Sequence, residues 1–146
     1  MYSFRESETH RPGDVVSAAE TPWGTFGLTI CYDVRFPYLY RTLAQAGAGI
    51  ISVPSAFTRR TGEAHWHVLL RSRAIETGAF IIAPAQCGDH EDGRKSYGHS
   101  LIVDPWGVVL ADGGEEIGIV YGDIDLGKIA KARSMIPSLT HDRPIS

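Results

Sequence analysis

Cys31 is the residue of this chain whose type and position best suit covalent chemistry. It follows residues 25–30, where Phe26, Leu28 and Ile30 alternate with small or polar residues, a pattern that predicts a strand. A helical segment starts at Pro37, so the thiol is expected at the carboxyl end of a strand, where α/β sheets place reactive groups. A thiol there is a candidate nucleophile. The alternative is a small apolar residue closing the strand, because free cysteine is among the most buried residue types.

Strands and helices alternate in the first half of the chain and would position this thiol. Helices are expected over residues 37–47, 62–77 and 126–136, and strands over residues 25–31, 48–57, 79–87 and 117–124. The first twenty or so residues read as a loop leading into an edge strand, residues 88–98 as a polar loop, and residues 101–103 with 108–110 as a hairpin. In residues 50–53 and 80–83 the side chains pointing both ways are apolar, so the sheet is expected to be covered on both faces, one of them by helices 37–47 and 62–77. The pattern indicates an α/β unit with antiparallel strands appended.

The composition fits one globular domain and excludes several classes of protein. The 146 residues are 43% hydrophobic with a net charge of −3, and the basic residues form no stripe, so neither nucleic acid nor an anionic membrane is an expected partner. No apolar run approaches the roughly 20 residues of a membrane span, and the polar N-terminus does not resemble a signal peptide. Cys31 and Cys87 have no CxxC spacing, so both are expected as free thiols in a reducing cytoplasm, with Cys87 buried and inert.

The histidines do not have the spacing of a metal site. His65 and His67 are two residues apart on an expected helix and point to different faces, and no HExxH-type motif occurs. His99 is expected to pack in a strand with a satisfied ring nitrogen. Glu76 is expected to pair with Arg73 as a structural ion pair. The sequence therefore predicts no metal and no cofactor.

Residues 27–37 read GLTICYDVRFP, which closely resembles the nucleophile motif of the nitrilase superfamily of carbon–nitrogen hydrolases, G-x-x-I-C-Y-D-x-R-F-P. Further segments resemble that family in the same order: PSAF at 54–57, TGEAHW at 61–66, RSRAIET at 71–77, AQCG at 85–88, SYGHS at 96–100 and VDPWG at 103–107. The resemblance runs from about residue 2 to 144 and is strongest to the Nit branch. It implies a nitrilase-type four-layer α-β-β-α sandwich, of which residues 1–146 would form about the C-terminal half, a partial carbon–nitrogen hydrolase domain.

The resemblance also implies a Glu–Lys–Cys triad with a second Glu as a fourth member. Cys31 matches the nucleophile, which would attack an amide carbonyl, form a thioester and release ammonia or an amine before water hydrolyses the thioester. The backbone N–H of Tyr32 matches an oxyanion donor. Glu6 matches the second Glu, which orients the Lys and the attacking water; the less favoured alternative is an ordinary exposed loop acid. The general-base Glu and the Lys would lie upstream of Met1, and none of the three lysines matches the Lys position.

Three further residues are candidates for substrate binding. Arg35 could steer a substrate carboxylate, or it could pair with Asp33 or Glu63 and fix the turn. Phe57 and Thr58 follow a strand end, where they could line the acyl site or serve only in packing.

The function implied is an amidase-type carbon–nitrogen hydrolase acting on a small non-peptide amide, chiefly a dicarboxylic monoamide or a deaminated dipeptide-like amide. The expected partners are that small molecule and either further copies of the chain or the missing N-terminal half. Two alternatives stay open. One is a catalytically incompetent fragment that serves as a binding or scaffold module. The other is a Cys–His thiol hydrolase, although no histidine falls in a motif near Cys31.

Overall fold

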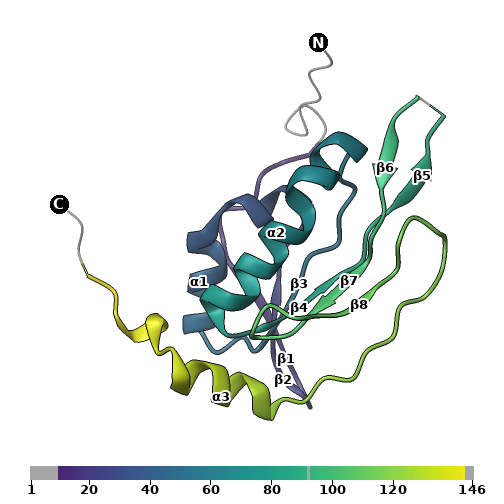
Figure 1. The fold of residues 1–146 in the computed structure, drawn as a ribbon. Helices are drawn as coiled ribbons and strands as arrows, with labels where there is room; N and C mark the ends of the chain where they lie inside the picture. The colour runs from purple at the N-terminus through teal and green to yellow at the C-terminus, as the bar shows by residue number, and fades with distance from the viewer. Residues whose placement is uncertain (1–9, 92, 144–146) are drawn as a thin grey trace.

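A mixed six-stranded sheet forms the centre of the computed structural model, which describes residues 10–91 and 93–143 (Figure 1). The strand order is β1-β2-β3-β4-β7-β8, and β2, β3 and β4 run parallel. The bounds are Ser17–Thr21 for β1, Gly24–Leu28 for β2, Ile50–Ser52 for β3, Phe80–Ala83 for β4, Leu101–Val103 for β7 and Val109–Asp112 for β8. Two short strands, β5 (Cys87–Asp89) and β6 (Lys95–Tyr97), pair separately as an antiparallel hairpin.

Three α-helices and two short 3-10 helices complete the described part of the chain. They are η2 (Cys31–Arg35), α1 (Pro37–Gln45), α2 (Arg59–Thr77), α3 (Gly127–Met135) and η3 (Ser138–Thr140). Proline opens α1, where its fixed φ suits the first helical position. Gly78 ends α2 in the left-handed conformation (φ +57°), which glycine adopts without strain.

The hydrophobic core lies between α1, α2 and one face of the sheet. Side chains that alternate along the central strands meet those of the two helices there: Ile51, Val53, Ile81, Ala83, Leu101, Val103, Leu43, Trp66 and Leu70. The indole N–H of Trp66 donates to the carbonyl of His99 at 2.8 Å, so the largest buried side chain is also satisfied. The expected packing of these two helices on one face is confirmed.

The opposite face of the sheet is apolar too. The alternate strand positions carry Phe26, Leu28, Ile50, Phe80, Ile82 and Ile102. Ile50 and Phe80 are buried, whereas Leu28 is 47% exposed. A β-carbon placed on Gly49 would meet Ile129 of α3 at 2.8 Å, and one on Gly122 would meet Ile102 at 3.1 Å, so residues 113–129 cover part of this face. The expectation of a sheet with two apolar faces is confirmed.

Several boundaries differ from the expectation. The strand that leads to the thiol ends at Leu28, although the N–H groups of Thr29 and Cys31 still donate to Ser52 and Pro54 along β3. Residues 88–98 are not a simple polar loop, because β5 and β6 pair there. Helix α2 begins at Arg59, three residues before the expected start.

The expected strand over residues 117–124 is wrong. The segment connects β8 to α3 in an extended path (Figure 1), and its backbone makes no hydrogen bond to another described residue. Ile117 is 95% exposed and Tyr121 is 81% exposed. The alternation of apolar residues is real, but a strand also needs a neighbouring strand to satisfy its backbone groups. Within residues 10–91 and 93–143, no helix is long and apolar enough to cross a membrane.

Candidate active site

Cys31 occupies a sharp turn at the end of the path that continues β2. Its φ is +45°, in the left-handed region that non-glycine residues rarely adopt and that costs of order 1–3 kcal/mol. The Cys31 N–H donates to Pro54 at 2.9 Å, and the Asp33 carboxylate accepts the Ile30 N–H at 2.9 Å. These hydrogen bonds hold the thiol in a fixed position at the start of η2.

Buried polar groups support the turn from behind. The Thr29 hydroxyl bonds to the Tyr40 hydroxyl at 2.7 Å and donates to the Ser52 carbonyl at 2.8 Å. Burial raises the pKa of Tyr40 far above its ordinary value, so this phenol stays neutral. The turn is therefore held by neutral hydrogen bonds as well as by the backbone.

Helix α2 holds the other end of the turn through Arg73. Its Nε donates to the Val34 carbonyl at 2.8 Å, and its Nη1 pairs with Glu76 at 2.9 Å. Partial burial raises the pKa of Glu76, and the attraction of Arg73 offsets only part of that rise. The expected Arg73–Glu76 ion pair is confirmed.

An open depression with a volume of about 1440 Å³ surrounds Cys31. Its floor comes from the segments that follow β2, β3 and β4, so it lies at the carboxyl ends of the parallel strands. Thr29, Ser55 and Ser100 belong to its lining, and Ser100 Oγ accepts the Ala85 N–H at 2.9 Å. It is larger than the pocket that encloses a typical small ligand, so these residues form an open wall of a site.

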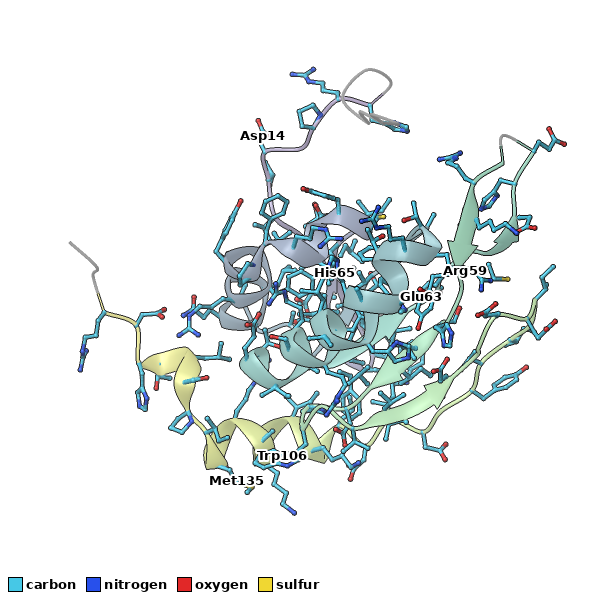
Figure 2. All side chains as sticks on the ribbon, turned by 45° about the horizontal axis from the view of Figure 1, so that its top comes forward. Asp14, Arg59, Glu63, His65, Trp106 and Met135 are labelled. Atoms are coloured by element: carbon cyan, nitrogen blue, oxygen red, sulfur yellow. The ribbon has the colours of Figure 1, made fainter. Side chains whose placement is uncertain are left out.

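The N-terminal segment forms one rim of this depression. Asp14 belongs to the lining and lies on a segment that projects away from the helices (Figure 2). Glu6, the expected second Glu, lies outside the described residues.

Tyr32 follows the nucleophile and lines the depression. Its side chain is 57% exposed, and no hydrogen bond from its backbone N–H to another described residue is present. That N–H is therefore a donor available beside the thiol, as an oxyanion site requires.

One alternative for Arg35 was an ion pair with Asp33 or Glu63. Among the described residues, Arg35 forms neither pair. Its guanidinium lies over the rings of Tyr32 (5.5 Å) and Phe57 (5.2 Å), and both terminal nitrogens are 3.4 Å from His65 Nδ1. Asp33 instead accepts the Ile30 N–H. A cation held on aromatic faces keeps its charge unneutralised next to the depression.

Phe57 and Thr58 lie apart from the lining of the depression. Phe57 is 7% exposed and packs on Trp66, with ring centroids 4.8 Å apart, so it belongs to the core beneath Arg35. Thr58 precedes α2 and bonds to Thr61 through the two hydroxyls at 2.9 Å. Neither residue belongs to the described lining, so the structure does not place them in contact with the depression.

The three lysines do not approach Cys31. Lys95 pairs with Asp89 at 3.1 Å, Lys128 pairs with Asp104 at 3.0 Å, and the third lysine is on α3. None of them belongs to the described lining of the depression. Cys87 is only partly buried, on β5, rather than fully buried as expected, because a two-stranded hairpin covers it less than a central sheet would.

Sequence reasoning missed the hydroxyl residues of the lining. Thr29, Ser55 and Ser100 look like ordinary strand-end residues when read singly. What they share is that each has a hydroxyl group and lies one to three residues from a strand of the six-stranded sheet. This shared position indicates a common site only when the strand order is known. A separate hollow of about 220 Å³ between α2 and α3 contains no thiol, so the chemistry is assigned to the Cys31 depression.

A family model described as carbon–nitrogen hydrolase matches residues 2–134. With 91% of its length inside that match, the chain belongs to the carbon–nitrogen hydrolase family. It is 51% identical over 142 residues to a deaminated glutathione amidase of Bos taurus, and 48% identical over 141 residues to one of Dictyostelium discoideum. These matches cover 97% and 96% of the chain but only 43% and 48% of the relatives. The chain thus spans less than half the length of both relatives.

Solved structures give the same fold. The Caenorhabditis elegans NitFhit protein matches with a TM-score of 0.92 and 45% identity, over 97% of this chain and 35% of that one. Saccharomyces cerevisiae Nit3, a member of branch 10 of the nitrilase superfamily, matches with a TM-score of 0.85 and 39% identity, over 90% of this chain and 49% of that one. The nitrilase-type α/β fold is therefore confirmed. A point mutant of an amidase from Nesterenkonia sp. is 30% identical to this chain and matches with a TM-score of 0.76, over 89% of this chain and 49% of that one. Its structure shows the acetamide moiety of fluoroacetamide added covalently to the active-site cysteine.

Proposed function

We propose that this chain carries the nucleophile of an amidase that cleaves a small non-peptide amide through a thioester on Cys31. The observation that carries the proposal is the Cys31 turn, where a thiol with left-handed backbone geometry lies beside the N–H of Tyr32, which donates to no other described residue. Strain of this kind persists at functional sites because the surroundings fix it.

The chemistry follows from these two groups. The Cys31 thiolate attacks the amide carbon, and the carbonyl electron pair moves to oxygen, where the Tyr32 N–H stabilises the negative charge. Collapse of the tetrahedral intermediate breaks the C–N bond, and the nitrogen leaves as ammonia or an amine after it takes up a proton. Water then attacks the thioester, releases the carboxylic acid and returns the thiol.

The base and the second oxyanion donor are not among the described residues at the site. The lining contains Asp14 and Asp33 as its carboxylates, and Asp33 already accepts the Ile30 N–H. We therefore propose that a Glu and a Lys come from outside residues 1–146, and that Glu6 assists as the second Glu. Residues 1–146 would then be one partial hydrolase domain that associates with a complementary half or with further copies, in the cytoplasm.

The substrate class is proposed from the relatives and from Arg35. The deaminated glutathione amidases of Bos taurus and Homo sapiens share 51% identity with this chain, and a deaminated dipeptide-like amide carries a carboxylate at a distance from the scissile bond. No carboxylate among the described residues pairs with the guanidinium of Arg35, which lies over the rings of Tyr32 and Phe57 and can attract such a carboxylate; Thr58 is the next residue along the chain.

The experiment compares the reactivity of the two cysteines. The native chain is mixed with the N-terminal half of a deaminated glutathione amidase, which supplies the Glu and the Lys, and is treated with a limiting amount of fluoroacetamide or iodoacetamide. Mapping the adducts by mass spectrometry should then show that Cys31 is labelled before Cys87. In the Cys31→Ser variant the labelling should fall to the slow rate of Cys87, and in Cys87→Ser it should stay unchanged. Preferential labelling of Cys87 would contradict the assignment.

The Cys–His alternative makes a different prediction. The histidine in the depression lining is His10, so a Cys–His hydrolase would need it as a base. A His10→Gln variant should keep the Cys31 labelling rate if the base is a Glu from outside the chain. If His10→Gln lowers the labelling rate as much as Cys31→Ser does, the Cys–His mechanism is favoured. A scaffold module without catalytic chemistry would show equal, slow labelling of both thiols.

A further inference from the structure

Three residues from separate elements converge at the edge of the sheet, and none of them belongs to the described lining of the Cys31 depression. His67 Nε2 lies 3.0 Å from Asp112 Oδ2, and His99 Nδ1 lies 2.9 Å from Asp112 Oδ1. His67 is on α2, His99 lies between β6 and β7, and Asp112 ends the edge strand β8. One donor atom from each residue lies within 4.8 Å of the other two. The spacing of the histidines in the sequence concealed this group, because its members are 13 and 32 residues apart.

The backbone and neighbouring side chains fix this cluster. His99 has φ +58°, a left-handed conformation that points its ring at Asp112, and its carbonyl accepts the indole N–H of Trp66 at 2.8 Å. The ring of Tyr97 stacks on the His99 ring at 4.3 Å. A strained conformation held by a buried tryptophan indicates that the orientation of His99 is imposed by the fold.

The charge and exposure of Asp112 suit a cation. Its Oδ1 accepts the Gly114 N–H at 2.9 Å, and its two oxygens face the rings of His67 and His99. The side chains of His67, His99 and Asp112 are 32%, 21% and 34% exposed, so solvent and ions reach all three.

We propose that His67, His99 and Asp112 form a binding site for a divalent first-row transition-metal ion such as Zn²⁺. Two imidazoles and one carboxylate are the ligands that such ions select over Mg²⁺ and Ca²⁺, which prefer oxygen. Metal–ligand bonds of about 2.1 Å in a tetrahedron place donor atoms roughly 3.4 Å apart, so the observed separations need only small side-chain movements. Water would fill the fourth position.

Metal binding would fix the positions of the ring protons. His67 Nε2 and His99 Nδ1 both face the Asp112 carboxylate. A metal bound there would use the lone pairs of these two nitrogens, so the ring protons would be on the opposite nitrogens, His67 Nδ1 and His99 Nε2. The ion would join α2 to the edge strand β8, which stabilises the folded state by mass action.

The test uses the tag-free chain of residues 1–146, titrated with Co²⁺ and followed by visible absorption. We expect one Co²⁺ per chain, with the weak ligand-field bands of nitrogen and oxygen ligands and without the thiolate charge-transfer band that binding at Cys31 or Cys87 would give. His67→Gln and Asp112→Asn should each weaken binding at least about tenfold, since even residues behind the ligands contribute that much at metal sites. His65→Gln is the matched control on the same helix and should bind Co²⁺ like the native chain.

A second measurement separates a binding effect from misfolding. Zn²⁺ should raise the thermal unfolding temperature of the native chain and of His65→Gln but not of His67→Gln, whereas Mg²⁺ should change none of them. Circular dichroism of the variants without metal should match the native spectrum. Absence of Co²⁺ binding, a thiolate band that persists in His67→Gln, or equal loss in His65→Gln would each overturn the proposal.

Discussion

Arg73 reaches from helix α2 to the turn of the nucleophile, where its Nε donates to the backbone carbonyl of Val34 at 2.8 Å. Val34 is fully buried and lies three residues after Cys31. Arg73 itself is 5% exposed, and its guanidinium lies 5.5 Å from the ring of Tyr40, which bonds to Thr29 on the other side of the turn. The buried side chain of Arg73 thus contacts both the segment after Cys31, through Val34, and the segment before it, through the Tyr40 ring that bonds to Thr29.

Replacing Arg73 should loosen this turn as well as lower stability. Arg73→Met leaves the Val34 carbonyl without its donor and Glu76 without its cation, so we expect a loss of about 2–4 kcal/mol in the free energy of unfolding by urea. The rate of Cys31 alkylation should also rise, because the turn becomes mobile. Arg71→Met is the matched control: Arg71 donates to the Gly107 carbonyl at 2.8 Å, far from the thiol. An unchanged alkylation rate in Arg73→Met would contradict this positioning role.

Gly62 should not tolerate a side chain, although it lies in a helix. A β-carbon there would come within 2.3 Å of Tyr97. Alanine normally stabilises a helix by about 1 kcal/mol relative to glycine, but the overlap with a packed ring costs more. We expect Gly62→Ala to lower the unfolding free energy by about 1–3 kcal/mol. Gly118→Ala is the control, since a β-carbon there meets nothing within 4 Å; stabilisation by Gly62→Ala would show that the helix start can move.

Asp104 should contribute stability that disappears in acid. Its Oδ1 accepts the N–H groups of Trp106 and Val108, and its Oδ2 accepts from Lys128 at 3.0 Å. Burial alone would raise its pKa, but these hydrogen bonds outweigh burial, and the net pKa lies below the ordinary 3.8. A lowered folded-state pKa means that the contribution is complete above the unfolded pKa and is lost as pH falls through the folded value.

We expect Asp104→Asn to lower the free energy of unfolding by about 1–3 kcal/mol near neutral pH, and we expect this difference to shrink in strong acid. Urea unfolding of the native chain and the variant across this range measures the difference. Asp142→Asn, at an exposed carboxylate paired with Arg41, should change stability little at any pH. A difference for Asp104→Asn that grows as pH falls would have the wrong sign and would refute this account.

Much of the fold follows from local pattern in the sequence. Apolar alternation in residues 50–53 and 80–83 identifies β3 and β4, and Gly78 ends α2 where a left-handed residue is needed. The same reasoning wrongly predicted a strand over residues 117–124. Alternation shows which side chains are apolar, but it does not show whether a neighbouring strand is present to pair with the segment. The β5–β6 hairpin was missed because its polar residues are stabilised by pairing with each other, which no single segment reveals.

The candidate site could be predicted only as far as its motif. Cys31 and Tyr32 are adjacent in the sequence, so one motif identifies both. The contact of Arg35 with His65 and the support from Arg73 join residues 30 and 39 positions apart, which only the packing of α2 on the turn decides. His67, His99 and Asp112 are also far apart in the sequence, and only the tertiary structure brings them together. Proximity across elements is set by tertiary structure, whereas spacing along the chain records only local geometry.

The chain alone should show no amidase turnover. Positioning, proton transfer and oxyanion stabilisation act as a unit, and each is typically worth orders of magnitude in rate. No lysine lies in the described lining of the Cys31 depression to serve as the second oxyanion donor. Incubation with deaminated glutathione or α-ketoglutaramate should release neither amine nor ammonia above the Cys31→Ala background. Turnover that vanishes in Cys31→Ala would show that residues of this chain replace the missing Glu and Lys.

The most direct measurement of the central claim is a search for the acyl-enzyme itself. The chain is mixed with the N-terminal half of a deaminated glutathione amidase and with deaminated glutathione, quenched in acid during turnover, digested and analysed by mass spectrometry. We predict a thioester of the substrate's acyl group on Cys31, absent in Cys31→Ala and unaffected by Cys87→Ser. An adduct that persists in Cys31→Ala, or turnover during which the acyl group is found on Cys87, would contradict the assignment of Cys31 as the nucleophile.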